Sequence, residues 1–335
     1  MNIHKLVSYC ASHTQSSLVR VDYLDGWRGL AIALVLQAHF FNIPFINSGR
    51  LGVDIFFVLS GLLMGNILFI KRTPLPIFYK RRASRIFPAF LIFVIAIYSF
   101  GFIYEFDFTA KEVVSTLTFM RTYLPAGIGI WEASLPIGHL WSLNVEEHGY
   151  LIMSLLTIPL IFRTKAWIPL GFIALGTIAI HLAYIYKLFP SQSNYGLRTE
   201  CALTHLMLSA SYCQVAHKIR KKIAPSMTFL VFCLACLCYT KIFPWWSSLL
   251  IGPFLLAFVV NHLSETWKVV KDILSHPVFR LLGIWSFSVY LWQQPFYSYK
   301  DSFPPGVALC LAILCGLLSF YFVENPIRGY LNRRW

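Results

Sequence analysis

A cation and an acid-base group stand eleven residues apart within one apolar stretch near the start of the chain. The stretch reads LDGWRGLAIALVLQAHFFNIPF and contains Arg28 and His39. Eleven helical residues bring a side chain back to within about 20° of its starting direction and rise roughly 16 Å, so both side chains share one face. Ionisable groups inside an apolar helix are costly and normally face a cavity or one another. We therefore expect a functional stripe; the alternative is a snorkelling Arg28 and a structural His39.

The chemistry that suits this stripe is proton transfer. A neutral imidazole accepts a proton near pH 7, which makes His39 the candidate general base. Asp54, in the sequence GRLGVDIFFVLSG, is expected at a similar level and could orient or charge-stabilise His39. The alternative for Asp54 is a helix cap. The candidate catalytic residues are His39, Arg28 and Asp54.

A basic cluster follows in the sequence KRTPLPIFYKRRASRIFP. Arg82 and Arg85 are spaced i, i+3 and share a helix face, and Arg81 lies beside them. Guanidinium groups bind phosphates through two parallel hydrogen bonds, so these arginines are candidates for holding the phosphates of an acyl-CoA. The alternative is a positive segment that contacts anionic lipid headgroups.

A second polar motif reads IGHLWSLNVEEHGYL and contains His139, Trp141 and Glu146. Carboxylates and a tryptophan suit the hydroxyls and the apolar face of a sugar, whereas an interfacial Trp with solvated acids is the ordinary alternative. Neither HExxH nor a Cys/His cluster with zinc spacing is present, so no metal is expected.

The elements that position these residues are membrane-spanning helices. The chain has 335 residues, of which 57% are hydrophobic and 13% charged. Apolar runs of about 20 residues, the length needed to cross a bilayer, recur throughout. We therefore predict an all-α, polytopic helical bundle with about ten spans, near 27–46, 51–70, 86–104, 148–163, 167–187, 201–217, 227–243, 246–263, 279–298 and 305–324.

Charge predicts the orientation of these spans. Of the 28 Lys and Arg residues, 20 fall on one side, 7 on the other, and Arg28 within the membrane, which favours cytoplasmic N- and C-termini. The expected organisation is a cytoplasmic segment over 1–22, a membrane domain over 23–330 with an outer loop near 105–147, and a tail over 331–335. No cleavable signal pattern occurs at the start, so we expect a multi-pass protein of the inner (cytoplasmic) membrane. The short basic clusters do not suggest nucleic acid, despite a net charge of +14.

Six segments together resemble the membrane-bound acyltransferase family 3, which includes O-antigen and nodulation-factor O-acetylases. The resemblance runs from about Tyr23 to Arg334. Its elements are YLDGWRGLAIALVLQAHF, GVDIFFVLSGLLMG, FYKRRASRIFP, HLWSLNVEEHGYL, WSFSVYLWQQPF and FVENPIR.

The resemblance implies that Arg28 and His39 are essential, with His39 as base or acyl-accepting residue. It also implies that Arg82 and Arg85 engage the acyl-CoA donor, and that Glu146 and Glu324 are recurrent acids without an assigned role. The implied co-substrate is cytoplasmic acetyl-CoA, with no bound cofactor, and the implied acceptor is a surface glycan or lipid-linked oligosaccharide. The sequence departs from the family pattern at His148, Gly149 and Gln293.

The expected function is therefore transfer of an acetyl or other short acyl group to a carbohydrate hydroxyl. The main alternative is a transporter or channel, since intramembrane Arg, His and Asp residues also build ion pathways. A third possibility is a receptor that keeps the fold without catalysis. Neither the sugar nor the oligomeric state follows from the sequence.

Overall fold

The computed structural model describes residues 21–41, 43–127, 129–159, 165–190, 192–219, 222–299 and 302–334. This part of the chain is helical, and it forms no strand beyond a single bridge between Ile46 and Thr240. The all-α prediction is confirmed for these residues. Most of the predicted N-terminal segment and the last residue, Trp335, lie outside the described residues.

Each of the ten predicted spans overlaps a helix. These helices are α2 (Asp22–Phe41), α3 (Ser48–Gly65), α4 (Leu75–Ile103), α6 (Trp141–Leu155), α8 (Trp167–Ile185), α10 (Thr204–Ile219), α11 (Pro225–Leu237), α13 (Gly252–Asn261), α15 (Pro277–Ser298) and α16 (Pro305–Ser319). Shorter helices connect them: α5 (Ala110–Leu117), α9 (Thr199–Ala202), α12 (Ser247–Leu250), α14 (Lys268–Leu274) and α17 (Asn325–Arg334).

Four continuous stretches in the described part are long and apolar enough to cross a bilayer. They are Ser48–Ile70, Leu75–Ile103, Trp167–Ile185 and Pro305–Arg334. Two of them continue through a π-helical turn, at Asn66–Ile70 and Phe320–Glu324. The chain is thus a membrane protein, while the number of ten crossings and the cytoplasmic termini remain predictions.

Two helices begin earlier than the hydropathy pattern predicts. Helix α4 begins at Leu75, before the span predicted near residue 86, and the Pro in its first turn suits a helix start. Helix α6 begins at Trp141 rather than near residue 148. Arg82, Arg85 and the VEEH segment therefore lie on helices, in agreement with the helix face predicted for the two arginines.

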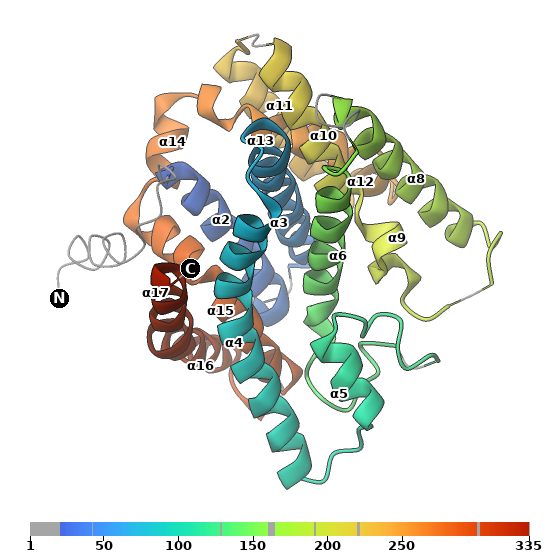
Figure 1. Cartoon of the computed structure of the whole chain (residues 1–335), viewed down its shortest axis with the longest axis vertical. Coiled ribbons are helices and arrows are strands. Elements are labelled where there is room, and N and C mark those ends of the chain that lie inside the picture. Colours follow the sequence, from blue (N-terminus) through green and yellow to red (C-terminus); the bar gives the residue numbers. More distant parts are fainter. Residues whose placement is uncertain are drawn as a thin grey trace.

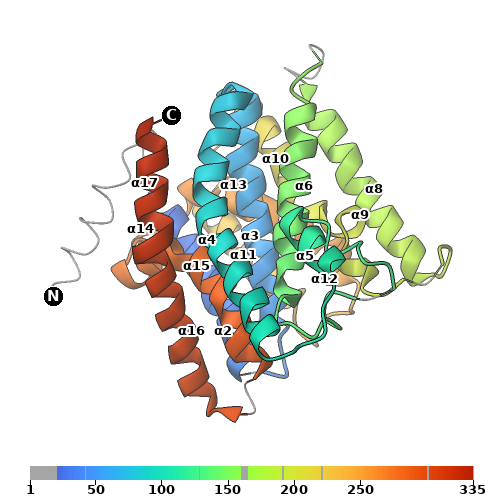
Figure 2. The same ribbon diagram turned by 60° about the horizontal axis from the view of Figure 1, so that its bottom comes forward.

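Helix α2 lies in the middle of the bundle and packs most extensively against α15 and α3 (Figure 1). Helix α3 also packs against α10, which in turn contacts α8 and α13. Figure 2 shows α16 and α17 along one edge and α8 at the opposite edge. The stripe that carries Arg28 and His39 therefore runs through the centre of the molecule.

Glycines set the distance between α2 and α15. A Cβ atom at Gly29 would lie 2.0 Å from the carbonyl oxygen of Phe279, and one at Gly283 would lie 1.8 Å from the carbonyl oxygen of Asp25. Small residues of this kind let helix backbones approach closely within a membrane. This contact fixes the height of Arg28, which follows Asp25 by one helical turn.

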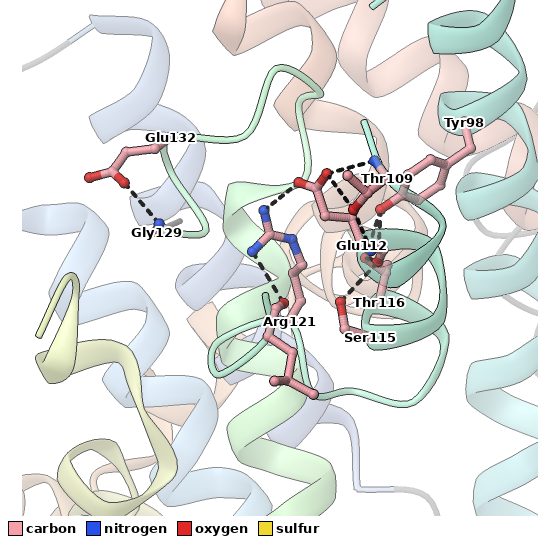
Figure 3. Close-up of polar contacts among 9 residues, drawn as sticks. Tyr98, Thr109, Glu112, Ser115, Thr116, Arg121, Gly129 and Glu132 are labelled. Carbon is pink, nitrogen blue, oxygen red and sulfur yellow. Dashed lines mark hydrogen bonds and ion pairs between the residues drawn. The ribbon is translucent and has the colours of Figure 1, made fainter. Parts of the chain in front are cut away.

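The long connection between α4 and α6 is anchored by a buried ion pair. Nη2 of Arg121 donates to Oε1 of Glu112 at 2.8 Å, and the Arg121 side chain is fully buried (Figure 3). Glu112 also completes a capping box at the start of α5, where its carboxylate accepts from the Thr109 backbone N–H at 2.9 Å. Tyr98 of α4 hydrogen-bonds Thr116 at 2.8 Å. One carboxylate thus ties α5 and the loop after it to the bundle.

A second anchor joins this connection to the start of α9. The hydroxyl of Tyr123 donates to the Glu200 carboxylate and accepts from the Thr199 backbone N–H at 3.0 Å. Burial, followed by the hydrogen bond to Glu200, raises the pKa of Tyr123 to about 12. The phenol therefore stays protonated and keeps donating throughout the neutral range.

Candidate functional site

The imidazole of His39 is held by a residue from α15. Its Nδ1 lies 2.6 Å from Oε1 of Gln293, and its ring stacks on Tyr297 with 4.4 Å between ring centroids. When this amide oxygen accepts, the proton lies on Nδ1, and Nε2 is the nitrogen that can take up a proton. This is the tautomer that a general base needs.

Asp54 lies in a separate cluster. Its Oδ2 accepts from Nε of Arg50 and from the hydroxyl of Tyr239, both at 2.9 Å, and lies 3.5 Å from Nε2 of His205. These partners of Asp54 do not include His39, and the side chain at Nδ1 of His39 is that of Gln293. The alternative that Asp54 caps its helix is wrong, because Asn47 caps α3 and Asp54 lies nearly two turns inside this helix.

His39 lines a cavity of about 880 Å³, which we call the His39 cavity. His139 lines it as well, with its ring against Phe93 and Tyr290, and it lies near enough to His39 for the two rings to interact electrostatically. Trp141 completes this side. The structure thus brings His39, His139 and Trp141 together around one space, whose lining also includes Asn47, Ser48, Arg50, Tyr239, Lys241 and Trp245.

A second, narrower cavity of about 90 Å³ contains the arginines, and we call it the arginine cavity. Arg28, Arg82 and Arg85 all line it, although they come from two different helices. Nη1 of Arg28 donates to Oδ1 of Asp25 at 3.0 Å. Arg28 and His39 therefore lie at two different levels of α2, as their eleven-residue spacing predicts.

Arg82 is fixed from two directions. Its Nη2 donates to Oε1 of Glu147 at 2.6 Å, and its guanidinium carbon lies 3.6 Å from the centroid of the Tyr150 ring. A guanidinium stacked on an aromatic face and paired with a carboxylate has a restricted orientation. The pair is largely buried, which makes Arg82 a pre-oriented cation beside Arg85.

Glu146 lines the arginine cavity. Its carboxylate accepts from Ser60 at 2.6 Å and from Tyr150. Trp141 at the start of α6 lines the His39 cavity, and five residues of helix carry Glu146 roughly 7 Å further along the axis. The acceptor-side or structural role of Glu146 stays a prediction.

Two further candidates lie apart from the cavities. Arg81 is exposed on the surface of α4 and does not contribute to the described lining of the arginine cavity. Glu324 is buried in the π-helical turn after α16, where it accepts from Ser288 at 2.7 Å. Glu324 interacts electrostatically with Arg328 and with Arg85, and Arg85 lines the arginine cavity.

The two cavities meet at two side chains. Val53 and Tyr290 are the residues common to both described linings. Tyr290 donates to the carbonyl oxygen of His139 at 2.8 Å and lies 2.6 Å from the hydroxyl oxygen of Ser142. A ligand arm that reached from the arginine cavity toward His39 would pass this tyrosine.

Sequence reasoning assigned no contact to Gln293 and did not single out Tyr290. Gln293 in YLWQQPF departs from the family pattern, but nothing in its local sequence indicates a contact with His39. Among the described residues, no group of three His, Cys, Asp or Glu side chains lies close enough to hold a metal ion.

The fold and the site define a helical membrane protein with two adjoining polar cavities, one cationic and one carrying histidines. A family model described as an acyltransferase domain matches residues 21–324, and the chain belongs to this family, acyltransferase family 3. The resemblance inferred from the six motifs is thus confirmed.

The relatives include two proteins named OatA. The chain is 27% identical to the peptidoglycan O-acetyltransferase OatA of Listeria monocytogenes over 95% of this chain and 58% of the relative. It is 25% identical to the O-acetyltransferase OatA of Staphylococcus aureus over 91% of this chain and 57% of the relative. The chain therefore spans somewhat more than half the length of these relatives. No solved structure matches.

Proposed function

We propose that the protein transfers an acetyl or other short acyl group from acyl-CoA to a hydroxyl of a cell-envelope glycan. The observation that carries this proposal is the contact between two unlike cavities at Tyr290 and Val53. Family membership and the O-acetyltransferase names of the relatives support it. The transporter alternative has no comparable support from the family.

In this proposal the arginine cavity holds the donor. Arg82 and Arg85 bind phosphate oxygens of CoA through charge-assisted hydrogen bonds, and Arg28 adds a third cation one helix away. The cavity of about 90 Å³ is too small for a whole CoA, so the nucleotide stays at its mouth and the narrow thioester arm enters. The arm then extends past Tyr290.

His39 acts on the acceptor. Nε2 takes the proton from a sugar hydroxyl while the oxygen attacks the thioester carbonyl, and Gln293 stabilises the resulting imidazolium through Nδ1–H. Collapse of the tetrahedral intermediate breaks the C–S bond. The proton on His39 passes to the departing thiolate, so the products are an O-acyl sugar and free CoA.

The test measures thiol release and glycan acylation by the detergent-purified chain with labelled acetyl-CoA. We expect both reactions from the wild type and loss of glycan transfer in His39→Ala. His217→Ala is the matched control, because His217 is exposed on α10 and away from both cavities. Neither a transporter nor a receptor consumes acetyl-CoA, so an inactive, well-folded wild type with a full range of glycans would exclude the proposed function.

A further inference from the structure

The described lining residues of the His39 cavity carry positive formal charge. Two cations, Arg50 and Lys241, line it, and no Asp or Glu does. Three tryptophans, Trp131, Trp141 and Trp245, contribute aromatic faces of the kind on which sugar rings stack. The positive formal charge of the described lining residues suits a ligand that carries negative charge.

Arg50 is held in one orientation by the buried carboxylate of Asp54. Asp54 accepts from its Nε at 2.9 Å, and Asp54 itself is buried and contributes nothing to the described cavity lining. Tyr239 and His205 hold the same carboxylate oxygen, so the counter-charge has a fixed position. Because Asp54 uses only Nε, the two terminal nitrogens of Arg50 keep their donors for another partner.

The ring of Trp141 completes this arrangement. The guanidinium carbon of Arg50 lies 5.8 Å from the ring centroid. The guanidinium thus lies over the face of the buried Trp141 ring, a cation–π contact that further restricts its orientation, while both oxygens of a ligand carboxylate can accept from its terminal nitrogens. The exposed rings of Trp131 and Trp245 are the faces on which a sugar ring can stack. Lys241, which is exposed at the rim, adds a second, mobile cation.

We propose that the acceptor bound in the His39 cavity is an anionic saccharide, whose carboxylate or phosphate group is held by Arg50 and attracted by Lys241. The inference rests on the proposed function and narrows its acceptor class. A preference for anionic acceptors that depends on Arg50 or Lys241 would arise in the His39 cavity, since neither residue lines the arginine cavity.

The experiment uses glycan acceptors in matched pairs. Each uronic-acid oligosaccharide is compared with its own carboxyl-reduced form, and each phosphate-substituted glycan with its dephosphorylated form. The readout is the ratio of acylation rates within a pair, measured with the intact chain in detergent at low salt. Charge-assisted hydrogen bonds predict a preference of about tenfold or more for the anionic member. The pair with the larger ratio distinguishes carboxylate from phosphate.

Three variants locate the source of the preference. Lys241→Gln should lower the ratio partly, and Arg50→Lys should lower it further while still pairing with Asp54. The double variant Arg50→Gln/Asp54→Asn removes the fork without leaving a buried carboxylate unpaired, and it should bring the ratio close to one. Lys268→Gln, an exposed change on α14, is the control that should keep the wild-type ratio.

The outcomes separate the inference from the function on which it rests. Equal rates for both members of every pair, or a preference that survives in all Arg50 and Lys241 variants, would overturn the anionic acceptor and leave acyl transfer standing. Transfer to no glycan of either kind would remove the proposed function itself.

Discussion

Gln293 and His39 are 254 positions apart in the chain, yet the Gln293 side-chain oxygen lies 2.6 Å from Nδ1 of His39. The contact joins the C-terminal end of α2 to the last third of α15, and it gives Nδ1 of His39 a side-chain partner. The glycine contacts between these two helices bring their backbones close enough for it. Helix packing thus provides the candidate base with its side-chain partner at Nδ1.

Replacing Gln293 should therefore impair turnover more than donor binding. Gln293→Leu removes the acceptor for Nδ1–H, and we expect kcat to fall about ten- to a hundredfold, since a positioned base contributes about 10²–10⁴ in rate. Gln293→His offers another ring nitrogen and should recover part of this loss. Steady-state kinetics with acetyl-CoA and an acceptor glycan provide the measurement. An unchanged kcat in a well-folded Gln293→Leu protein would show that His39 needs no such partner.

Replacing Arg82 would leave the Glu147 carboxylate without its ion-pair partner. Arg85 is therefore the better residue for testing donor binding. We expect Arg85→Ala to raise the Kd for acyl-CoA about ten- to hundredfold, equal to about 1.5–3 kcal/mol. Arg85→Lys should restore only part, because it keeps the charge and loses the fork. Titration calorimetry with CoA measures both. Arg81→Ala, exposed on the same helix, should have a smaller effect, and an equal one would place Arg81 in the donor site.

Glu146→Gln should change the use of the donor rather than that of the acceptor, since the carboxylate lines the arginine cavity with Arg28 and Arg82. The amide keeps the size and the acceptor oxygen for Ser60 and Tyr150, so the fold should survive. We expect the KM for acyl-CoA to change at least threefold and the KM for the glycan to stay nearly constant, with the preserved hydrogen bond limiting the effect. The reverse pattern would place Glu146 on the acceptor side.

The Arg121–Glu112 pair predicts an effect on stability. Arg121→Ala leaves a buried carboxylate without its cation, and loss of one partner of a buried pair typically costs about 3–5 kcal/mol. We expect a lower melting temperature in detergent, and fluorescence-detected size exclusion after heating measures it. Arg121→Met combined with Glu112→Gln removes both charges and should recover much of the loss. A single variant as stable as the wild type would mean that the pair does not anchor the connection.

Sidedness can be tested in sealed vesicles of known orientation. The predicted cytoplasmic termini and the two levels of α2 lead us to expect that acetyl-CoA supplied on the arginine side labels a glycan on the other side. Label confined to the donor's own side would refute transfer across the bilayer while leaving the acyltransferase proposal intact. Protease protection of an added N-terminal tag fixes the orientation independently.

Local pattern was enough to predict much of the architecture. Apolar run length located a helix at each predicted span, and helical periodicity placed Arg28 and His39 on one stripe. The i, i+3 spacing likewise placed Arg82 and Arg85 in one cavity. These features depend on neighbours within a few residues, and such neighbours are visible in the sequence.

The remaining features depend on tertiary contacts. Gln293 reaches His39 only because α2 and α15 pack at glycine distance. The position of Glu146 depended on where α6 begins, which hydropathy gives poorly when polar residues occupy the first turns. The capping box TAKE, from Thr109 to Glu112, was a local signal for the start of α5 that the hydropathy reading passed over.

The junction at Tyr290 and Val53 has a consequence for the cell's energy supply. An unbroken aqueous path from one cavity to the other would let protons run down the gradient that powers the membrane. Tyr290 is held at this junction by the His139 carbonyl and by Ser142, beside the apolar side chain of Val53. If the Tyr290 side chain moves aside for a narrow acyl arm and then returns, the acyl group can pass while few protons cross the membrane. Proton leak through liposomes containing Tyr290→Ala would measure how much of that insulation one phenol ring provides.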